Sequence, residues 1–328
     1  MAKTFVAWLT GVGTPSAVRT GGGRVRPDRQ REVRAGSDAM VRVAVATLWS
    51  TPDAVRPIDS RALGRTADIP SWVASMSAEQ QIGDGVLSQL LLGERVRVDE
   101  VRDDGWVRVV ALQQPGARDR RGYPGWIPAE QLSQAGSGDT PAGDDTTLVV
   151  DATSTDLRAT PGGPVVLANV MIGTRLMPLG ELVDGWWPVG AGDGLMWVAA
   201  ADVTTLGQPA AALEVASRLR GVPYVWGGLS AYGIDCSGLV HLSWRRCGVV
   251  LPRDAADQAD ATRSVPLGSE RPGDLYFFAR PGRRIHHVGI VTGSRRMLHA
   301  CYTQRRVVEE PLPEAREATL VAAHRVVG

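Results

Sequence analysis

The sequence predicts an α+β protein in which a mixed C-terminal domain follows two small all-β modules. The prediction rests on two observations. The last third of the chain contains both a helical pattern and strand patterns, and the middle of the chain contains short strands of alternating polarity that recur. A length of 328 residues suits two or three domains, and 44% hydrophobic with 22% charged residues is ordinary for a globular protein. A net charge of +1 and the lack of a long apolar run predict neither a nucleic-acid partner nor a membrane span.

A helix is predicted to begin at Cys236. Apolar or small residues at 239, 240, 243, 244 and 247 form one helical face, with Cys236 in the first turn. Unpaired N–H groups and the positive end of the helix dipole favour a thiolate there, and a nearby imidazolium would favour it further. We therefore expect Cys236 to be a nucleophile that is ionised near neutral pH, with its own backbone N–H as an oxyanion donor.

Two histidines follow on predicted strands. Residues 285–291 are rich in β-branched residues, and their alternation places His287 on the face that is expected to meet the helix. Residues 296–301 are predicted to form the next strand of a hairpin, so His299 can lie beside His287 and hold its imidazole by a hydrogen bond. His286 remains an alternative base.

These residues stand in a series of motifs that spans the last third of the chain. The series comprises Tyr-x-Trp-Gly-Gly at 224–228, Asp-Cys-Ser-Gly at 235–238, Arg-Pro-Gly-Asp-Leu at 271–275, His-Val-Gly-Ile at 287–290 and a closing histidine. In these motifs, residues 207–328 resemble the NlpC-type, papain-like cysteine peptidases that cut peptidoglycan stem peptides. The resemblance implies that Cys236 is the nucleophile, His287 the base, His299 the third polar residue and Tyr224 a residue near the thiol.

The other two cysteines, Cys247 and Cys301, are expected to be packing residues, as buried free cysteines usually are. Three cysteines without a Cys-x-x-Cys spacing predict neither a disulfide framework nor a structural zinc site. A reducing compartment is the simplest setting for them. No metal or cofactor is expected.

The middle of the chain contains a weak internal repeat. Gly-Glu-Arg-Val at 93–96 parallels Gly-Thr-Arg-Leu at 173–176, and each is followed at equal spacing by Asp-Gly-Trp, at 104–106 and 184–186. Two copies of one small β module explain the pattern, which resembles bacterial SH3-like domains. The first copy carries an insertion in which a helix is expected to begin near Ser77, where Ser-x-x-Gln has a capping-box pattern.

Together the patterns predict a papain-like NlpC-type catalytic domain preceded by two small SH3-like β-barrels. The start of the chain has a short apolar run without a convincing signal-peptide core, so a cytoplasmic protein is expected, with a secreted or wall-associated protein as the alternative. The predicted divisions are a flexible tail or mis-assigned start at 1–40, the first SH3-like domain with its insertion at 41–134, a linker at 135–146, the second SH3-like domain at 147–206 and the peptidase domain at 207–328.

Two such modules ahead of an NlpC-type domain resemble a narrower group, the γ-D-glutamyl-L-diamino acid endopeptidases (dipeptidyl-peptidase VI type) of murein peptide recycling. Ala-Thr-Leu-Trp at 46–49 and Gly-Tyr-Pro-Gly-Trp at 122–126 carry this resemblance. It implies hydrolysis of L-Ala-γ-D-Glu-diamino acid stem peptides that have a free N-terminal L-Ala, the diamino acid being meso-diaminopimelate or L-lysine. A secreted lysin that acts on intact peptidoglycan, with the SH3-like pair as wall-binding modules, is the alternative. A monomer is expected.

The same resemblance implies contacts to the peptide amine. Tyr123 is the candidate contact from the first module, and Asp235 is the candidate carboxylate for the ammonium group, because a charge in a closed pocket needs a partner. Members of the group are expected to supply a further acid shortly before the Gly-Glu-Arg-Val strand, but none stands there in this chain. Glu94 is a weak substitute, or else a solvated strand residue.

The γ-D-glutamyl residue leaves a free α-carboxylate, which some donor must meet. Ser237, next to the nucleophile, and Arg253, in a Pro-Arg motif after the nucleophile helix, are the candidates. Arg253 has an alternative role, in which it braces its own loop through Asp254.

Overall fold

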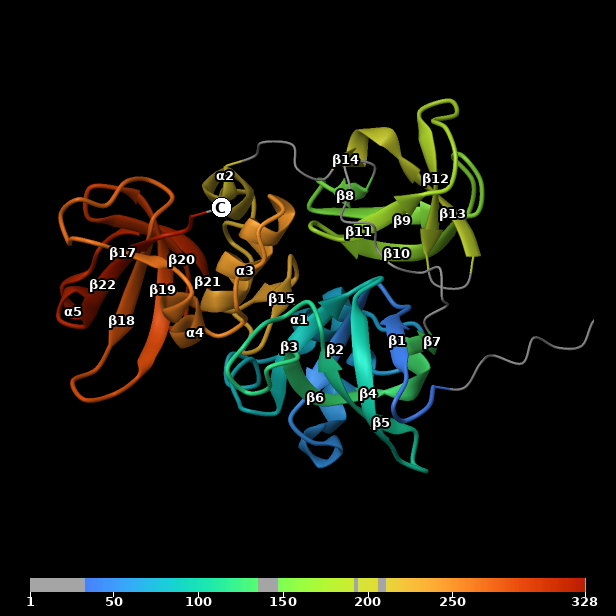
Figure 1. Cartoon of the computed structure of the whole chain (residues 1–328), viewed down its shortest axis with the longest axis horizontal. Helices are drawn as coiled ribbons and strands as arrows, with labels where there is room; N and C mark the ends of the chain where they lie inside the picture. The colour runs from blue at the N-terminus through green and yellow to red at the C-terminus, as the bar shows by residue number, and fades with distance from the viewer. Residues whose placement is uncertain (1–32, 135–146, 192–193, 206–210, 328) are drawn as a thin grey trace, which may run out of the picture. The chain divides into compact units, whose positions relative to one another are not determined.

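The computed structural model describes residues 33–134, 147–191, 194–205 and 211–327. The linker predicted at 135–146 and most of the predicted tail lie outside the described residues. Short helices accompany three main sheets, so the fold class is α+β, as predicted (Figure 1). Within the described ranges, no helix has the length and apolar character needed to cross a bilayer.

The first module is a seven-stranded sheet in the order β3-β2-β6-β5-β4-β1-β7. Its first strand begins at Asp38 and pairs with β4 and β7, so residues 38–40 belong to this sheet and not to the tail. The bounds are β1 (Asp38–Val41), β2 (Val45–Trp49), β3 (Val86–Leu91), β4 (Arg95–Val101), β5 (Trp106–Ala111), β6 (Tyr123–Pro128), the 3₁₀ helix η3 (Ala129–Gln131) and β7 (Leu132–Gln134).

The second module repeats the first strand for strand. Its order, β10-β9-β13-β12-β11-β8-β14, is that of the first sheet with each number raised by seven, which confirms the internal repeat. The equivalent turn glycines Gly93 and Gly173 have φ angles of 78° and 82°, which only glycine adopts freely. Neither order closes on itself among the described strands, so the sheets are small β domains but not closed barrels. The bounds are β8 (Leu148–Val150), β9 (Ser154–Arg158), β10 (Val165–Met171), β11 (Arg175–Pro178), β12 (Trp186–Ala191), β13 (Gly194–Ala199), η4 (Ala200–Asp202) and β14 (Val203–Thr205).

The insertion of the first module lies between β2 and β3 and holds η1 (Pro52–Ala54), η2 (Pro57–Ala62) and α1 (Ile69–Ser75). Helix α1 starts after Asp68, whose side chain accepts a hydrogen bond from the N–H of Ser71. The helix expected from Ser77 is wrong. The Ser77 and Gln80 pair makes its reciprocal hydrogen bonds, at 2.8 and 3.3 Å, but closes only a turn, because glycines at 83 and 85 lead directly into β3.

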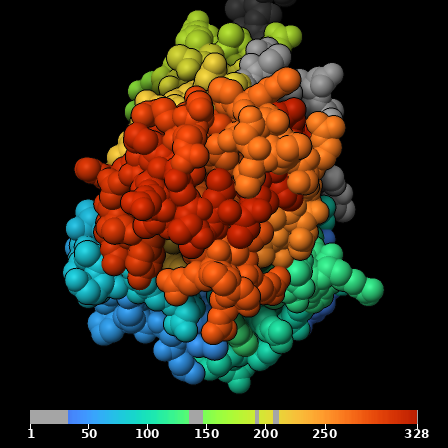
Figure 2. Space-filling model, turned by 90° about the vertical axis from the view of Figure 1, so that its left-hand side faces the viewer, coloured from blue at the N-terminus to red at the C-terminus, as the bar shows by residue number. Residues whose placement is uncertain are grey.

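The C-terminal domain packs helix α3 (Cys236–Arg246) against β19 (Ile285–Gly293) and β20 (Arg296–Cys301). The helix and both strands are those that the sequence predicts. They belong to a six-stranded sheet in the order β17-β22-β18-β19-β20-β21, which with its loops forms much of the face shown in Figure 2. The other bounds are α2 (Ala212–Ser217), β15 (Leu229–Ser230), β16 (Gly233–Ile234), α4 (Ala255–Asp260), β17 (Arg263–Val265), β18 (Leu275–Ala279), β21 (Arg306–Pro311), α5 (Glu314–Glu317) and β22 (Leu320–Arg325).

The first module and the C-terminal domain share buried polar contacts. Glu94, at the turn before β4, accepts from Arg245 of α3 at 2.9 Å, and their side chains are 0% and 3% exposed. The side-chain oxygen of Gln89 on β3 accepts from the backbone N–H of Leu229 at 2.9 Å. Glu94 therefore neither contacts substrate nor lies in solvent, in contrast to both sequence-based expectations. It is a buried anchor between the two parts of the chain.

Replacing Glu94 by alanine should destabilise the fold strongly, because the charge of Arg245 would remain buried without its partner. The expected loss is about 3–5 kcal/mol in the free energy of unfolding, measured by urea denaturation. Glu100→Ala, at the exposed end of the strand β4 that follows Glu94, is the matched control and should change the free energy of unfolding by about 0.5 kcal/mol or less. Equal effects of the two substitutions would contradict a structural role for the Glu94–Arg245 pair.

Candidate active site

Cys236 is the first residue of α3, and two glycine motifs fix its position. Asp235 caps the helix, its Oδ1 accepting from the N–H of Gly238 at 2.6 Å. A Cβ on Gly238 would lie 2.4 Å from the carbonyl oxygen of Gly228, and a Cβ on Gly228 would lie 2.5 Å from the oxygen of Gly233. Gly238 is thus required by the close approach of the two motifs, and Gly228 by its close approach to β16.

The Asp235 carboxylate is held by Arg253. Its two oxygens accept from Nη1 and Nη2 of Arg253 at 3.0 and 2.7 Å, and Oδ2 also accepts from the N–H of Gly227 at 3.0 Å. This arrangement does not favour the prediction that Asp235 receives the peptide ammonium group, although Asp235 does line the pocket over Cys236. Its charge is already neutralised by a guanidinium whose side chain is 1% exposed.

Arg253 has no donor left for a substrate carboxylate. Besides its bonds to Asp235, Nη1 donates to the hydroxyl of Ser237 at 3.0 Å, Nη2 to the carbonyl of Gly228 at 3.3 Å, and Nε to the hydroxyl of Ser88 at 2.8 Å. These contacts use all five N–H groups of a guanidinium. Arg253 therefore has a structural role, which is one of the two alternatives considered from the sequence. It holds its surroundings in place through Asp235 and not through Asp254.

The surroundings of the Cys236 thiol act on its pKa in both directions. Burial, and then the Asp235 carboxylate, raise its pKa to about 12, although the N–H groups of Val288 and Ser237 lower it. Desolvation thus opposes the resting thiolate that the first turn of the helix favours, and that thiolate stays a prediction. The contribution of Val288 places the sulfur beside the backbone of β19, next to His287. Burial also raises the pKa of Tyr224, with the Cys236 thiol as the next cause, so that residue lies near the thiol as expected.

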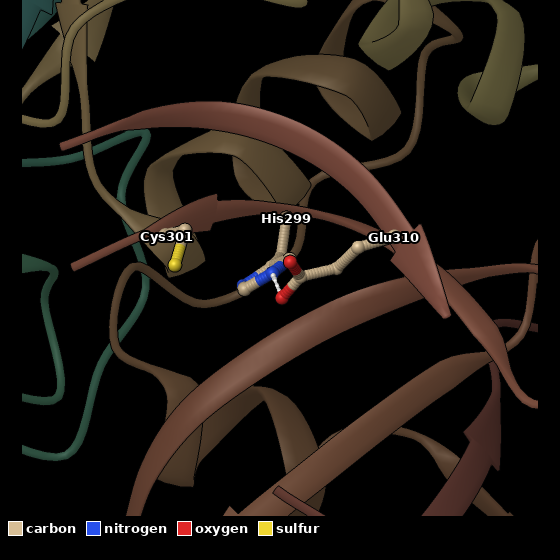
Figure 3. Close-up of side chains that lie close together, drawn as sticks. All are labelled: His299, Cys301 and Glu310. Atoms are coloured by element: carbon tan, nitrogen blue, oxygen red, sulfur yellow. Dashed lines mark hydrogen bonds and ion pairs between the residues drawn. The ribbon is translucent and has the colours of Figure 1, made fainter. Parts of the chain in front are cut away.

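His287 and His299 form a hydrogen-bonded pair that continues to Glu310 on β21. Nε2 of His287 lies 2.8 Å from Nδ1 of His299, and Nε2 of His299 lies 3.1 Å from Oε1 of Glu310 (Figure 3). Burial lowers the pKa of His287 well below its ordinary value and that of His299 to about 4, so both rings are neutral at pH 7. Sequence reasoning missed Glu310, whose place is set by strand pairing.

The carboxylate of Glu310 fixes the tautomers of both rings. A carboxylate only accepts, so Nε2 of His299 carries the proton and its Nδ1 must accept from Nε2 of His287. His287 is then left with an unprotonated Nδ1, which is the form a general base requires. The solvent-exposed His286 has no such link to His299 among the described contacts.

The face of β19 that meets α3 differs from the one expected. Val288 and Ile290 join the core around α3, whereas His287 packs on Phe278, with ring centroids 5.5 Å apart. Gly289 leaves room for His299 on the neighbouring strand and not for the helix. A Cβ added at position 289 would lie 3.3 Å from the Cβ of His299.

A pocket of about 660 Å³ opens over Cys236 and takes walls from both the first module and the C-terminal domain. The sequence did not show that the first module reaches the nucleophile, and the lining residues show that it does. The module supplies Leu87, Ala117, Arg118 and Tyr123, and the C-terminal domain supplies Tyr224, Trp226, Asp235, Cys236, Ser237, residues 254–257 and residues 284–286.

Asp254 is the carboxylate of this pocket that keeps room for a ligand. It accepts from the hydroxyl of Tyr123 at 2.9 Å and from Nε of Arg118 at 3.4 Å, and its side chain is 36% exposed. Asp257 also lines the pocket but is 8% exposed and accepts from the N–H of Ala117 at 2.7 Å. Sequence reasoning named Asp254 only as a possible brace, because its neighbour Arg253 carried the motif.

The described residues contain one further group of donors that could hold a metal ion, formed by His299, Cys301 and Glu310. Three free cysteines are present, and Cys301 is buried, as expected.

Comparison with known proteins agrees with this geometry. A model of the NlpC/P60 family matches residues 221–324. A gamma-D-glutamyl-L-lysine dipeptidyl-peptidase of Bacillus subtilis (strain 168) is 32% identical over 80% of this chain and 90% of its own length. A protein of the same name from Bacillus cereus (strain ATCC 10987) is 31% identical over 86% and 88%.

A solved structure gives the same result at the level of the fold. The crystal structure of an NlpC/P60 family protein from Bacillus cereus ATCC 10987 superposes with a TM-score of 0.80 at 28% identity, over 88% of this chain and 99% of that one. The match includes the two β modules and not the catalytic domain alone. With its cysteine at the start of α3 and its histidine pair on the adjoining sheet, this chain belongs to the NlpC/P60 family and is a cysteine peptidase.

Proposed function

We propose that this protein hydrolyses the bond between γ-D-glutamate and the diamino acid in murein stem peptides with a free N-terminal L-Ala, and releases L-Ala-D-Glu. One observation carries the proposal: the Tyr123 hydroxyl of the first module is bonded to the Asp254 carboxylate within the pocket of Cys236. Such a wall limits how much peptide can lie on that side of the nucleophile. The names of the two Bacillus relatives support the same bond and the same dipeptide product.

The chemistry is acyl transfer with Cys236, His287 and His299. The thiol proton passes to Nδ1 of His287 as the sulfur attacks the γ-carbonyl, and the backbone N–H of Cys236 donates to the oxyanion. His287 then gives this proton to the leaving amine of the diamino acid, which frees the C-terminal product. Water hydrolyses the thioester, with His287 again as the base. A neutral thiol and a neutral imidazole suit this sequence, because the proton moves only when the substrate carbonyl is in place.

Asp254 is the proposed partner of the peptide ammonium group, with Tyr123 beside it. The carboxylate has one hydroxyl and one long guanidinium contact, and more than a third of its side chain is exposed, so an ammonium can add to it without breaking a buried ion pair. Ser237 stays a candidate contact, since it lines the pocket. All N–H groups of Arg253 already have partners. The α-carboxylate of D-glutamate can therefore bind Arg118 or Arg284, which are the other arginines on the pocket wall.

A cytoplasmic, monomeric protein is part of the same proposal. The three cysteines are all free, which suits a reducing compartment. The murein peptide recycling that the resemblance of the sequence implies would take place inside the cell.

The proposal is tested by cleavage of three substrates followed by mass spectrometry. L-Ala-γ-D-Glu-L-Lys should yield L-Ala-D-Glu. The same peptide with an acetylated N-terminus, and intact peptidoglycan, should be cut at least about a hundredfold more slowly, since neither offers the ammonium charge that Asp254 would bind. A peptide with meso-diaminopimelate in place of lysine identifies the diamino acid. Cys236→Ala should be folded and inactive. Equal cleavage of the acetylated peptide or of the wall would indicate a lysin and would contradict the proposal.

Asp254→Asn should weaken selection for the free amine more than it weakens the chemistry. The asparagine oxygen can still accept from Tyr123, but the charge is lost, so kcat/KM for the free peptide should fall by about tenfold to a hundredfold. The value for the acetylated peptide should change little. Asp260→Asn, an exposed residue at the end of the same helix α4, controls for net charge and should have no effect. If both peptides lost activity equally in Asp254→Asn, the residue would not be the amine partner.

A further inference from the structure

Cys301 lies beside the histidine pair but takes no part in the proposed reaction. It is 4% exposed, and its sulfur lies in a group with a ring nitrogen of His299 and a carboxylate oxygen of Glu310, all within 4.8 Å of one another (Figure 3). His299 and Cys301 are two residues apart on β20 and so share a face of the sheet. Glu310, on β21, pairs with Met297, which shares that face too.

We propose that His299, Cys301 and Glu310 bind a divalent transition-metal ion of the zinc class, and that the bound metal switches off the peptidase. A thiolate, an imidazole and a carboxylate are the three donor types that Zn²⁺ takes, and a water can complete a tetrahedral site. Mg²⁺ and Ca²⁺ are disfavoured, because both prefer oxygen donors alone. The Glu310 side chain is 19% exposed and gives the ion a way in.

The three donors are already gathered in the metal-free protein. Glu310 Oε1 accepts from His299 at 3.1 Å, its Oε2 accepts from the amide of Gln304 at 2.5 Å, and the backbone N–H of Gln304 donates to the sulfur of Cys301 at 3.4 Å. No Cys-x-x-Cys spacing in the sequence indicates such a site. Pairing of two neighbouring strands brings the donors together instead.

Inhibition follows from the direction of the hydrogen-bond chain. A metal on Nε2 of His299 takes the position of the proton that Glu310 accepts, so that proton moves to Nδ1 and the Cys301 thiol proton is released to solvent. Nδ1 of His299 then donates to Nε2 of His287, and the proton of His287 moves to its Nδ1. The base is thereby blocked at the atom that must receive the proton of Cys236.

Metal binding itself is tested without any assay of activity. Reduced full-length Cys236→Ala protein, which lacks the nucleophile thiol, is titrated with Co²⁺ and followed by its near-ultraviolet thiolate-to-metal absorption. The band should appear with one equivalent of Co²⁺, persist when Cys247→Ser is added, and vanish when Cys301→Ser is added. A band that survives Cys301→Ser, or no band in Cys236→Ala, would overturn the proposed site.

The proposal that the bound metal inhibits the peptidase rests on the proposed function, so its test uses the active enzyme. Cys301→Ser should cleave L-Ala-γ-D-Glu-L-Lys at the normal rate but need at least about tenfold more Zn²⁺ for half-inhibition, whereas Cys247→Ser should behave like the unchanged protein. Glu310→Gln, tested for Co²⁺ binding, is the second variant if Cys301→Ser does not fold. Equal Zn²⁺ sensitivity of Cys301→Ser and Cys247→Ser would mean that zinc acts at Cys236, and would refute this switch even if the peptidase activity is as proposed.

Discussion

The Asp235–Arg253 ion pair is the interaction on which the rest of the site depends. It caps the nucleophile helix, because the carboxylate that binds Arg253 also accepts from Gly238 N–H. It ties that helix to the first module, because the same guanidinium donates to the hydroxyl of Ser88 on β3. A buried pair is costly to desolvate, and it persists only where every donor and acceptor is used. Here the five guanidinium N–H groups all have partners, so the pair is a fixed framework and not a binding group.

This framework determines which carboxylate is available to substrate. Asp235 stands next to Cys236 in sequence but has its charge satisfied, whereas Asp254, next to Arg253, turns to the pocket and meets Tyr123. The charge of Glu94 is likewise paired with that of Arg245. Asp235, Glu94 and Asp254 are the three acids considered from the sequence. Of these, Asp254 stays accessible, and it accepts a hydrogen bond from the Tyr123 hydroxyl of the first module. In the proposed function, recognition of the peptide amine and docking of the module therefore depend on the same contact.

Sequence reasoning succeeded where the signal was local. The helix at Cys236, the strands that carry His287 and His299 and the internal repeat follow from periodicity and turn glycines, which act over a few residues. It failed where partners are distant in sequence: Arg253 and Ser88 are 165 residues apart, and Tyr123 and Asp254 are 131 apart. Composition does not reveal such pairs, so the sequence indicated Asp235 as the partner of the peptide amine, whereas we propose Asp254. Burial of the Cys236 thiol could not be predicted for a related reason, because it depends on the complete fold and not on the first turn of a helix.

The most direct test is a crystal structure of Cys236→Ala with L-Ala-γ-D-Glu-L-Lys bound. The account predicts that the peptide nitrogen lies within about 3 Å of an Asp254 oxygen and of the Tyr123 hydroxyl. It also predicts that Asp235 keeps both contacts to Arg253, and that the γ-carbonyl lies over the position of the missing thiol. A complex in which the ammonium group binds Asp235, with Arg253 displaced toward the glutamate carboxylate, would contradict it.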